Sequence, residues 1–133
     1  MADVTVKRTE DFEPSFGGGM LKARAGLGVT SFGMQLLRFP PHADRYPEHD
    51  HSHDGQEEVY TVLEGRVTLQ AGGEEHELEP GTFARVGANE RRKLSTGEQP
   101  ALILALAGVP GRPFEITDYT EEGAPDPLPA RQG

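Results

Sequence analysis

The stretch HSHDGQEEVYTVLEG, residues 51–65, joins a polar beginning to a run of β-branched and aromatic residues that ends on glycine. The second part, 58–65, is typical of a β-strand. Side chains alternate between the two faces of a strand, so Glu58 and Tyr60 are expected to point the same way, with Glu57 on the opposite side. The register of the strand decides which of the two glutamates faces the interior.

Further short runs, each bounded by glycine or proline, predict more strands at 30–39, 66–71, 71–78, 79–86 and 100–108. The runs 58–65 and 66–71 predict a hairpin that turns near Glu64 and Gly65. The apolar run 100–108 is short and tightly bounded, which favours a buried strand over a helix. Many short strands with turn signals between them predict an all-β sandwich or barrel.

Length and composition limit the function. A chain of 133 residues fits one domain with its own core. The net charge of −9 argues against binding to a phosphate backbone, and no apolar run is long enough for a membrane helix. We expect no nucleic-acid or membrane partner and, since no secretory signal is evident, a cytoplasmic location. The chain has no cysteine, so any metal must be held by nitrogen and oxygen.

Three of the five histidines, His49, His51 and His53, occupy alternate positions just before the strand. In an extended segment they would project to one face, and a turn at 54–55 would bring a glutamate from 57–58 beside them. Imidazole and carboxylate groups are common ligands of divalent metals. The pattern favours a metal site over a solvated, histidine-rich loop.

These residues resemble the first motif of the cupin superfamily: His51, Ser52 and His53, four residues, Glu58, six residues, and Gly65. The segment 78–94 resembles the second motif. The resemblance implies an all-β fold, the double-stranded β-helix or jelly-roll barrel of the cupins. It also implies a small-molecule pocket inside the barrel, frequent metal binding, and a homodimer to which the N-terminal arm contributes.

The second motif departs from the family pattern. Counting from Gly81, the usual last histidine ligand falls on Arg92, and residues 82–99 contain no histidine. Arginine stays protonated and has no lone pair to give to a metal.

Three alternatives remain open. His49 could complete a ligand set with the family residues. The pair His49 and His51 could instead be the ligating histidines, with a glutamate from 57–58. Or the barrel holds no metal, and an arginine from 91–92 pairs with Glu58 or with an anionic substrate.

The domain organisation is predicted as an arm that could contact a dimer partner, a cupin barrel and a flexible tail, at 1–25, 26–118 and 119–133. Near the start of the acidic, proline-rich end, Phe114, Ile116 and Tyr119 are expected to pack, and the last ten residues are expected to lack fixed structure.

The function predicted is a small single-domain cupin that binds a small molecule and acts as a metal-dependent enzyme, oxygenase- or isomerase-like, on a polar or carboxylated substrate. The alternative is a non-catalytic ligand-binding or sensor cupin with a degenerate metal site, so enzymatic activity stays open and no catalytic residue is assigned. The metal would be zinc, iron, nickel or manganese. The expected metal ligands are His49, His51, His53 and Glu58, and the expected substrate-binding residues are Arg92 and Tyr60.

Overall fold

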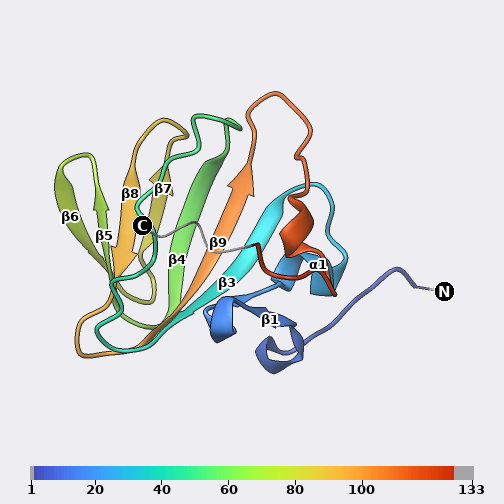
Figure 1. Cartoon of the computed structure of the whole chain (residues 1–133), viewed down its shortest axis with the longest axis horizontal. Helices are drawn as coiled ribbons and strands as arrows, with labels where there is room; N and C mark the ends of the chain where they lie inside the picture. The colour runs from blue at the N-terminus through green and yellow to red at the C-terminus, as the bar shows by residue number, and fades with distance from the viewer. Residues whose placement is uncertain (1, 128–133) are drawn as a thin grey trace.

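Two antiparallel sheets make up the computed structural model, which describes residues 2–127 (Figure 1). The larger sheet has the strand order β1-β2-β3-β9-β4-β7, and the smaller has the order β6-β5-β8. Within the described residues the strands are β1 (Pro14–Ser15), β2 (Met20–Leu21), β3 (Gly33–Phe39), β4 (Glu57–Gly65), β5 (Val67–Ala71), β6 (Glu74–Leu78), β7 (Phe83–Val86), β8 (Arg92–Ser95) and β9 (Ala101–Gly108). The predicted all-β barrel fold is confirmed.

The core between the sheets follows from strand alternation. Tyr60 and Val62 of β4 point to the inner face of the larger sheet, as do Ile103 of β9 and Leu37 of β3. Leu69 and Leu94 close the core from the smaller sheet. The run 100–108 is therefore a strand, as predicted, and its continuous apolar character reflects burial on both faces.

The hairpin predicted between 58–65 and 66–71 is wrong. β4 pairs with β7 and β9, whereas β5 pairs with β6 and β8, so the chain crosses from one sheet to the other after Gly65. Gly65 has φ of 82°, and a Cβ there would lie 1.9 Å from the carbonyl oxygen of Pro100. A glycine with positive φ marks a tight crossing as readily as a hairpin turn.

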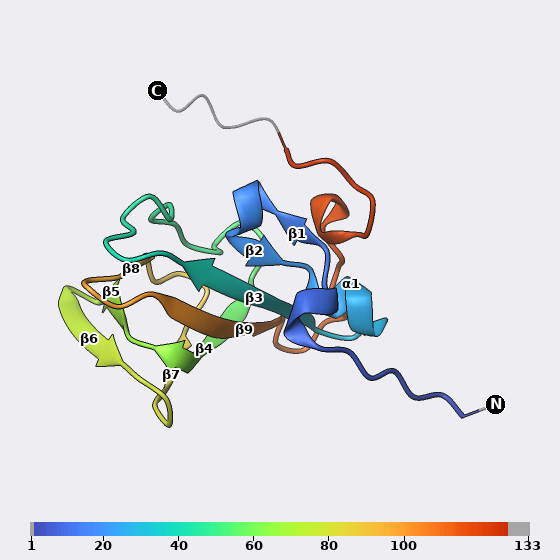
Figure 2. The ribbon, with the colours of Figure 1, turned by 90° about the horizontal axis from the view of Figure 1, so that it is seen from below.

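The other face of the larger sheet is covered over β3 and β9 by the N-terminal part of the chain (Figure 2). Phe12, Leu21 and Ala23 form a second apolar cluster with Leu36 and Leu102. A short helix, α1 (Ala23–Leu27), ends at Gly28, which takes the left-handed conformation with φ of 82°. Thus much of the predicted arm 1–25 belongs to the packed body.

The segment after β9 returns to this N-terminal part. Phe114 packs against Gly33, and a 3-10 helix at Asp118–Thr120 places Tyr119 edge-on to Phe16. Of the predicted tail 119–133, residues 119–127 lie in this packed segment, and 128–133 lie outside the described residues. No helix within residues 2–127 has the length and apolar character needed to cross a membrane.

Candidate metal and ligand site

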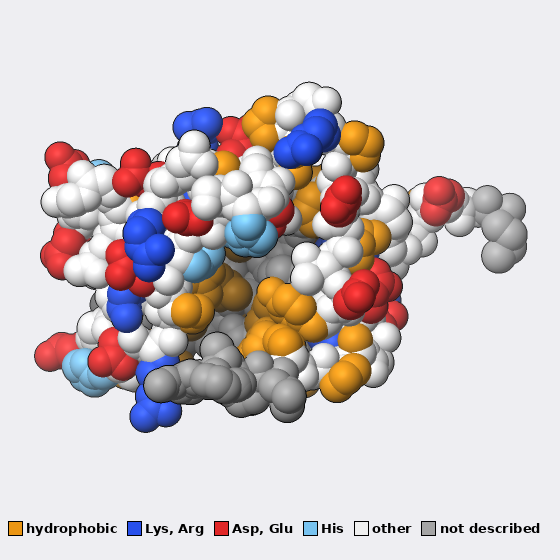
Figure 3. Space-filling model, turned by 45° about the horizontal axis from the view of Figure 1, so that its top comes forward, with side chains coloured by type: hydrophobic (Ala, Val, Ile, Leu, Met, Phe, Trp, Pro, Cys, Tyr) orange, Lys and Arg blue, Asp and Glu red, His pale blue; other side chains and the backbone are white. Residues whose placement is uncertain are grey.

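A cavity of about 890 Å³ opens between the larger sheet, the long connection from β3 to β4, and the segment after β9. Figure 3 shows its mouth, with histidine side chains at the rim and hydrophobic side chains around the hollow. His49, His51, His53 and Glu58 all line it. The predicted histidine cluster therefore faces a ligand-sized space.

The sheet register explains why this end of the barrel is hollow. Glu58 of β4 lies opposite Ala107 of β9, which lies opposite Gly33 of β3. One row deeper, Tyr60 is opposite Ala105. The two alanines present only methyl groups where the rows further in carry Ile103 and other large side chains, so space is left beside the glutamate.

Register also decides between the two glutamates. Glu58 points inward with Tyr60, and its side chain is 13% exposed. Glu57 lies on the outer face, where its carboxylate accepts a hydrogen bond from Arg85 Nε at 2.9 Å. The alternation predicted for 58–65 holds as far as Val62, and between Val62 and Glu64 the pairing with β9 shifts register.

The extended conformation expected over 49–53 holds only for its first half. The backbone of His49 pairs with Arg92 in both directions, at 3.0 and 2.9 Å. After His51 the chain turns, because the amides of Asp54 and Gly55 donate back to the His51 carbonyl oxygen. The three histidines therefore do not share one strand face, since His53 sits in the turn.

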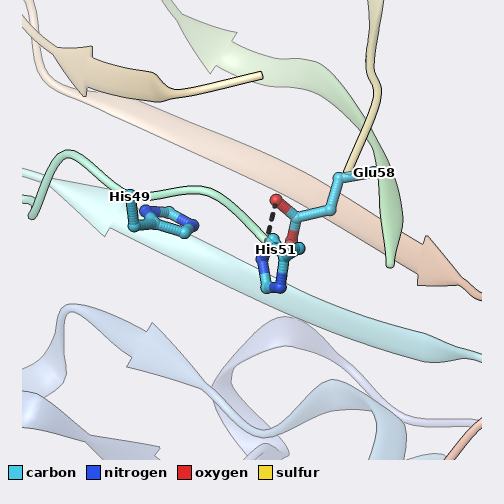
Figure 4. A group of neighbouring side chains, drawn as sticks. All are labelled: His49, His51 and Glu58. Atoms are coloured by element: carbon cyan, nitrogen blue, oxygen red, sulfur yellow. Dashed lines mark ion pairs between the residues drawn. The ribbon is translucent and has the colours of Figure 1, made fainter. Parts of the chain in front are cut away.

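The structure brings His49, His51 and Glu58 together (Figure 4). One ligand atom from each lies within 4.8 Å of the others. His53 belongs instead to a neighbouring group with His51 and Asp54, and its side chain is 73% exposed. Its imidazole stacks on that of His51 with ring centroids 5.8 Å apart.

Hydrogen bonds fix the tautomer of His49 and the orientation of the His51 ring. His49 Nδ1 lies 2.9 Å from the carbonyl oxygen of Pro47, which can only accept, so Nδ1 carries the proton and Nε2 keeps its lone pair. His51 Nδ1 lies 3.1 Å from an oxygen of Asp54, while Nε2 lies 3.4 Å from Glu58 Oε1. Outer carboxylate and carbonyl partners of this kind orient the histidine ligands of metal sites.

Two buried side chains that do not line the cavity donate hydrogen bonds to the Glu58 carboxylate. Tyr60 donates its hydroxyl proton to Glu58 Oε1 at 2.5 Å, and Arg92 Nη1 donates to the same oxygen. Among residues 2–127, no protein group donates a hydrogen bond to Glu58 Oε2. One oxygen is thus anchored and the other is left for a ligand.

Arg92 is fully buried, and its remaining hydrogen bonds also go to the protein. Its Nη2 and Nε donate to the carbonyl oxygens of Gly87 and Glu90 at 2.8 and 3.1 Å, and Nη1 also reaches the Tyr60 hydroxyl at 3.3 Å. The contact between Arg92 and Glu58 that the third alternative included is present, whereas its barrel without metal stays a prediction.

The protonation states follow from these contacts. Burial lowers the pKa of His49, which favours the neutral imidazole. The hydrogen bond to Glu58 raises the pKa of His51 against the effect of burial. Burial acts to raise the pKa of Glu58, but hydrogen bonds from His51 and Tyr60 and the nearby positive charge lower it overall, so Glu58 is ionised.

Several cavity residues were not identified from sequence. Asp54 orients His51, and its only sequence signal is its place in the turn at 54–55. Gln35 lines the cavity and is oriented by the amide of Ala23, which donates to its side-chain oxygen at 3.2 Å. Tyr119, expected only to pack, also lines the cavity.

The chain belongs to the cupin family: the family model described as the cupin domain matches residues 35–107, more than half of the sequence. No curated protein matches the chain.

Solved structures with the same fold include a cupin protein from Bacteroides fragilis, with a TM-score of 0.68, 21% identity, and coverage of 89% of this chain and 94% of that one. A sugar phosphate isomerase of the cupin superfamily from Silicibacter pomeroyi matches with a TM-score of 0.66 and 22% identity, covering 78% of this chain and 75% of its own. The DMSP lyase DddQ from Ruegeria pomeroyi matches with a TM-score of 0.55 and 22% identity over 70% of this chain and 46% of its own. At these identities the likeness establishes the fold.

Proposed function

We propose that this cupin holds a divalent metal ion through His49, His51 and Glu58, and acts on a small polar or carboxylated molecule in the adjoining cavity. The observation that carries the proposal is the convergence of their ligand atoms within 4.8 Å at the cavity wall. Two imidazoles and a carboxylate suit zinc, iron, nickel or manganese.

The donor set fits a metal atom by atom. His49 offers Nε2 because Nδ1 is committed to Pro47. His51 offers Nε2 once that nitrogen is deprotonated, while Asp54 holds Nδ1. Glu58 offers Oε2, since Tyr60 and Arg92 occupy Oε1. His49 would then supply the ligand that the second motif lacks.

A bound metal would supply Lewis acidity or an activated water for the reaction. The chain itself supplies position: Tyr60 and Arg92 fix the Glu58 carboxylate, and Asp54 fixes the His51 ring. Gln35 presents its amide to the same space. The named activities of the isomerase and the lyase with this fold make an enzyme reasonable for this chain, without identifying its reaction.

Two of the predicted roles take a more specific form. His53 stays a predicted ligand, but its exposure and its pairing with Asp54 place it outside the three-residue group. Arg92 and Tyr60 stay predicted to serve the substrate, and we propose that they do so through Glu58, because both are buried away from the cavity. The homodimer and the cytoplasmic location also stay predictions.

A second candidate is a ligand-binding cupin without catalysis. The observation that favours it is the guanidinium of Arg92 beside Glu58, which compensates the carboxylate charge and opposes a nearby cation. In that case Glu58 and His51 would serve as hydrogen-bonding groups for the ligand.

Elemental analysis of the untagged protein after incubation with zinc, nickel, manganese and iron tests the metal. We expect one ion per chain. In a separate unfolding measurement, the free energy of unfolding should increase by about 2.7 kcal/mol when the free metal is in hundredfold excess over its Kd. His51→Ala should abolish both the uptake and the stabilisation.

His76→Ala is the matched control, because His76 lies on β6, is about half exposed and does not line the cavity. It should bind metal like the unmodified chain. Substoichiometric uptake of all four metals would contradict the metal proposal and favour the ligand-binding alternative.

A further inference from the structure

The cavity has a wall that the cupin domain does not provide. Thr117, Tyr119 and Thr120 line it, yet they lie beyond the matched range 35–107. The segment 114–126, which we call the C-terminal strap, thus adds cavity surface outside the matched cupin range.

The strap is anchored by a fully buried lysine. Lys22 Nζ donates to the carbonyl oxygens of Glu121 and Ala124 at 2.9 and 3.0 Å, and to the Glu13 carboxylate at 2.9 Å. All three ammonium protons therefore have acceptors, two of them in the strap. A buried charge is tolerated only when it is satisfied in this way.

Three further contacts hold the strap in register. Arg24 Nη2 donates to the Glu121 carboxylate at 2.9 Å, and the Gly123 amide donates to Glu13 at 2.8 Å. The Asp126 carboxylate accepts from the Phe16 amide at 2.8 Å. Charge-assisted bonds therefore fix the backbone that follows Tyr119, from Glu121 to Asp126.

Tyr119 carries a hydroxyl with no partner of its own in the described part of the chain. Its ring is fixed edge-on against Phe16 with centroids 5.7 Å apart, and the residue is half-buried in the cavity wall. Burial, with the negative charges of Glu58 and Asp54, raises the pKa of Tyr119, so the phenol stays protonated at neutral pH. Tyr119 lines the same cavity as His49, His51 and Glu58.

We propose that Tyr119 is a ligand-binding residue whose hydroxyl donates a hydrogen bond to a carboxylate oxygen of the molecule bound beside His49, His51 and Glu58. The strap positions this donor through Lys22 and Arg24. The inference rests on the proposed function for the place of the ligand, and of the polar and carboxylated molecules proposed there it favours those that carry a carboxylate as acceptor.

The test titrates acetate into the Co(II)-loaded protein and follows the visible absorption of cobalt. Tyr119→Phe keeps the ring against Phe16 and removes only the hydroxyl, so Co(II) uptake should not change. Its acetate affinity should fall about tenfold, as expected for the loss of one hydrogen bond to a charged group. Tyr46→Phe is the control, because Tyr46 lines the same cavity but packs its ring between Phe39 and His49; its acetate affinity should match the unmodified chain.

Equal acetate affinities for Tyr119→Phe and the unmodified chain would overturn the inference. So would equal losses in the two tyrosine variants, or no acetate binding by the unmodified chain. If the unmodified chain takes up no Co(II), the proposed metal function fails by itself. The same acetate comparison, followed in the metal-free protein by amide chemical shifts, then decides the role of Tyr119.

Discussion

Two cations, Arg92 in the barrel and Lys22 beneath the strap, are equally buried but stabilise different parts of the molecule. Arg92 pairs with a carboxylate that faces the cavity, so it fixes one side chain of the site. Lys22 pairs with a more exposed carboxylate and with two backbone carbonyls, so it fixes a segment of chain. The comparison suggests that loss of Arg92 damages the folded barrel, whereas loss of Lys22 loosens one wall of the cavity.

The largest effect is expected for Arg92→Met. Removing one partner of a buried ion pair leaves Glu58 uncompensated, which costs about 3–5 kcal/mol. Urea unfolding measures the loss. The double variant Arg92→Met with Glu58→Gln should recover much of it, because neither charge remains. A loss similar to that of a surface substitution would mean that the pair is not buried as described.

A smaller and local effect is expected for Lys22→Met. Two strap carbonyls and Glu13 lose a donor, at a cost of about 1–3 kcal/mol. Hydrogen exchange should rise in residues 114–126 and stay unchanged in β4. Faster exchange throughout the barrel would show that Lys22 supports the core, and the contrast with Arg92 would then fail.

The pH dependence should test the contact between Lys22 and Glu13. The hydrogen bond from Lys22, with that from the Gly123 amide, lowers the pKa of Glu13 below its ordinary value of 4.5. A carboxyl with a lowered folded pKa contributes stability that is present above its unfolded value and is lost as the pH falls through the folded one. Hydrogen exchange in the strap should therefore increase as the pH falls below 4.5. Glu13→Gln should lack this acid-dependent step, and a step that persists in this variant would assign it to another carboxyl.

The smallest effect is expected for His53→Ala. Because His53 is exposed and outside the group with Glu58, its removal should weaken metal binding by less than the roughly tenfold loss typical of a group that orients a ligand. Metal titration against His51→Ala measures the contrast. Equal losses in the two variants would restore His53 to the ligand set.

Local patterns predicted the parts of the fold that depend on neighbouring residues. Alternation along 58–65 was sufficient to place Glu58 and Tyr60 together, because strand geometry fixes which side chains share a face. The prediction failed at Gly65, because a glycine suggests a turn but does not show where the chain goes after it. The crossing to the other sheet brings Gly65 against Pro100, which is thirty-five positions away.

The same reasoning applies to the candidate site. The pairing of His49 and His51 with Glu58 was open to prediction because the three lie within ten residues. The turn after His51 could not be predicted in this way, because it depends on backbone hydrogen bonds that the alternation of side chains does not reveal. The bonds from Lys22 to Glu121 and Ala124 join residues about a hundred apart, and an acidic, proline-rich segment contains no local signal for them.

The methyl groups of Ala105 and Ala107 have a consequence for the range of molecules that fit. Both line the cavity, and they lie opposite Glu58 and Tyr60 in the neighbouring strand. The small size of these two side chains therefore contributes to the room that the cavity offers a bound molecule. Exchange of either alanine for valine or leucine would reduce the size of the largest ligand that fits, while every polar group of the site stays in place.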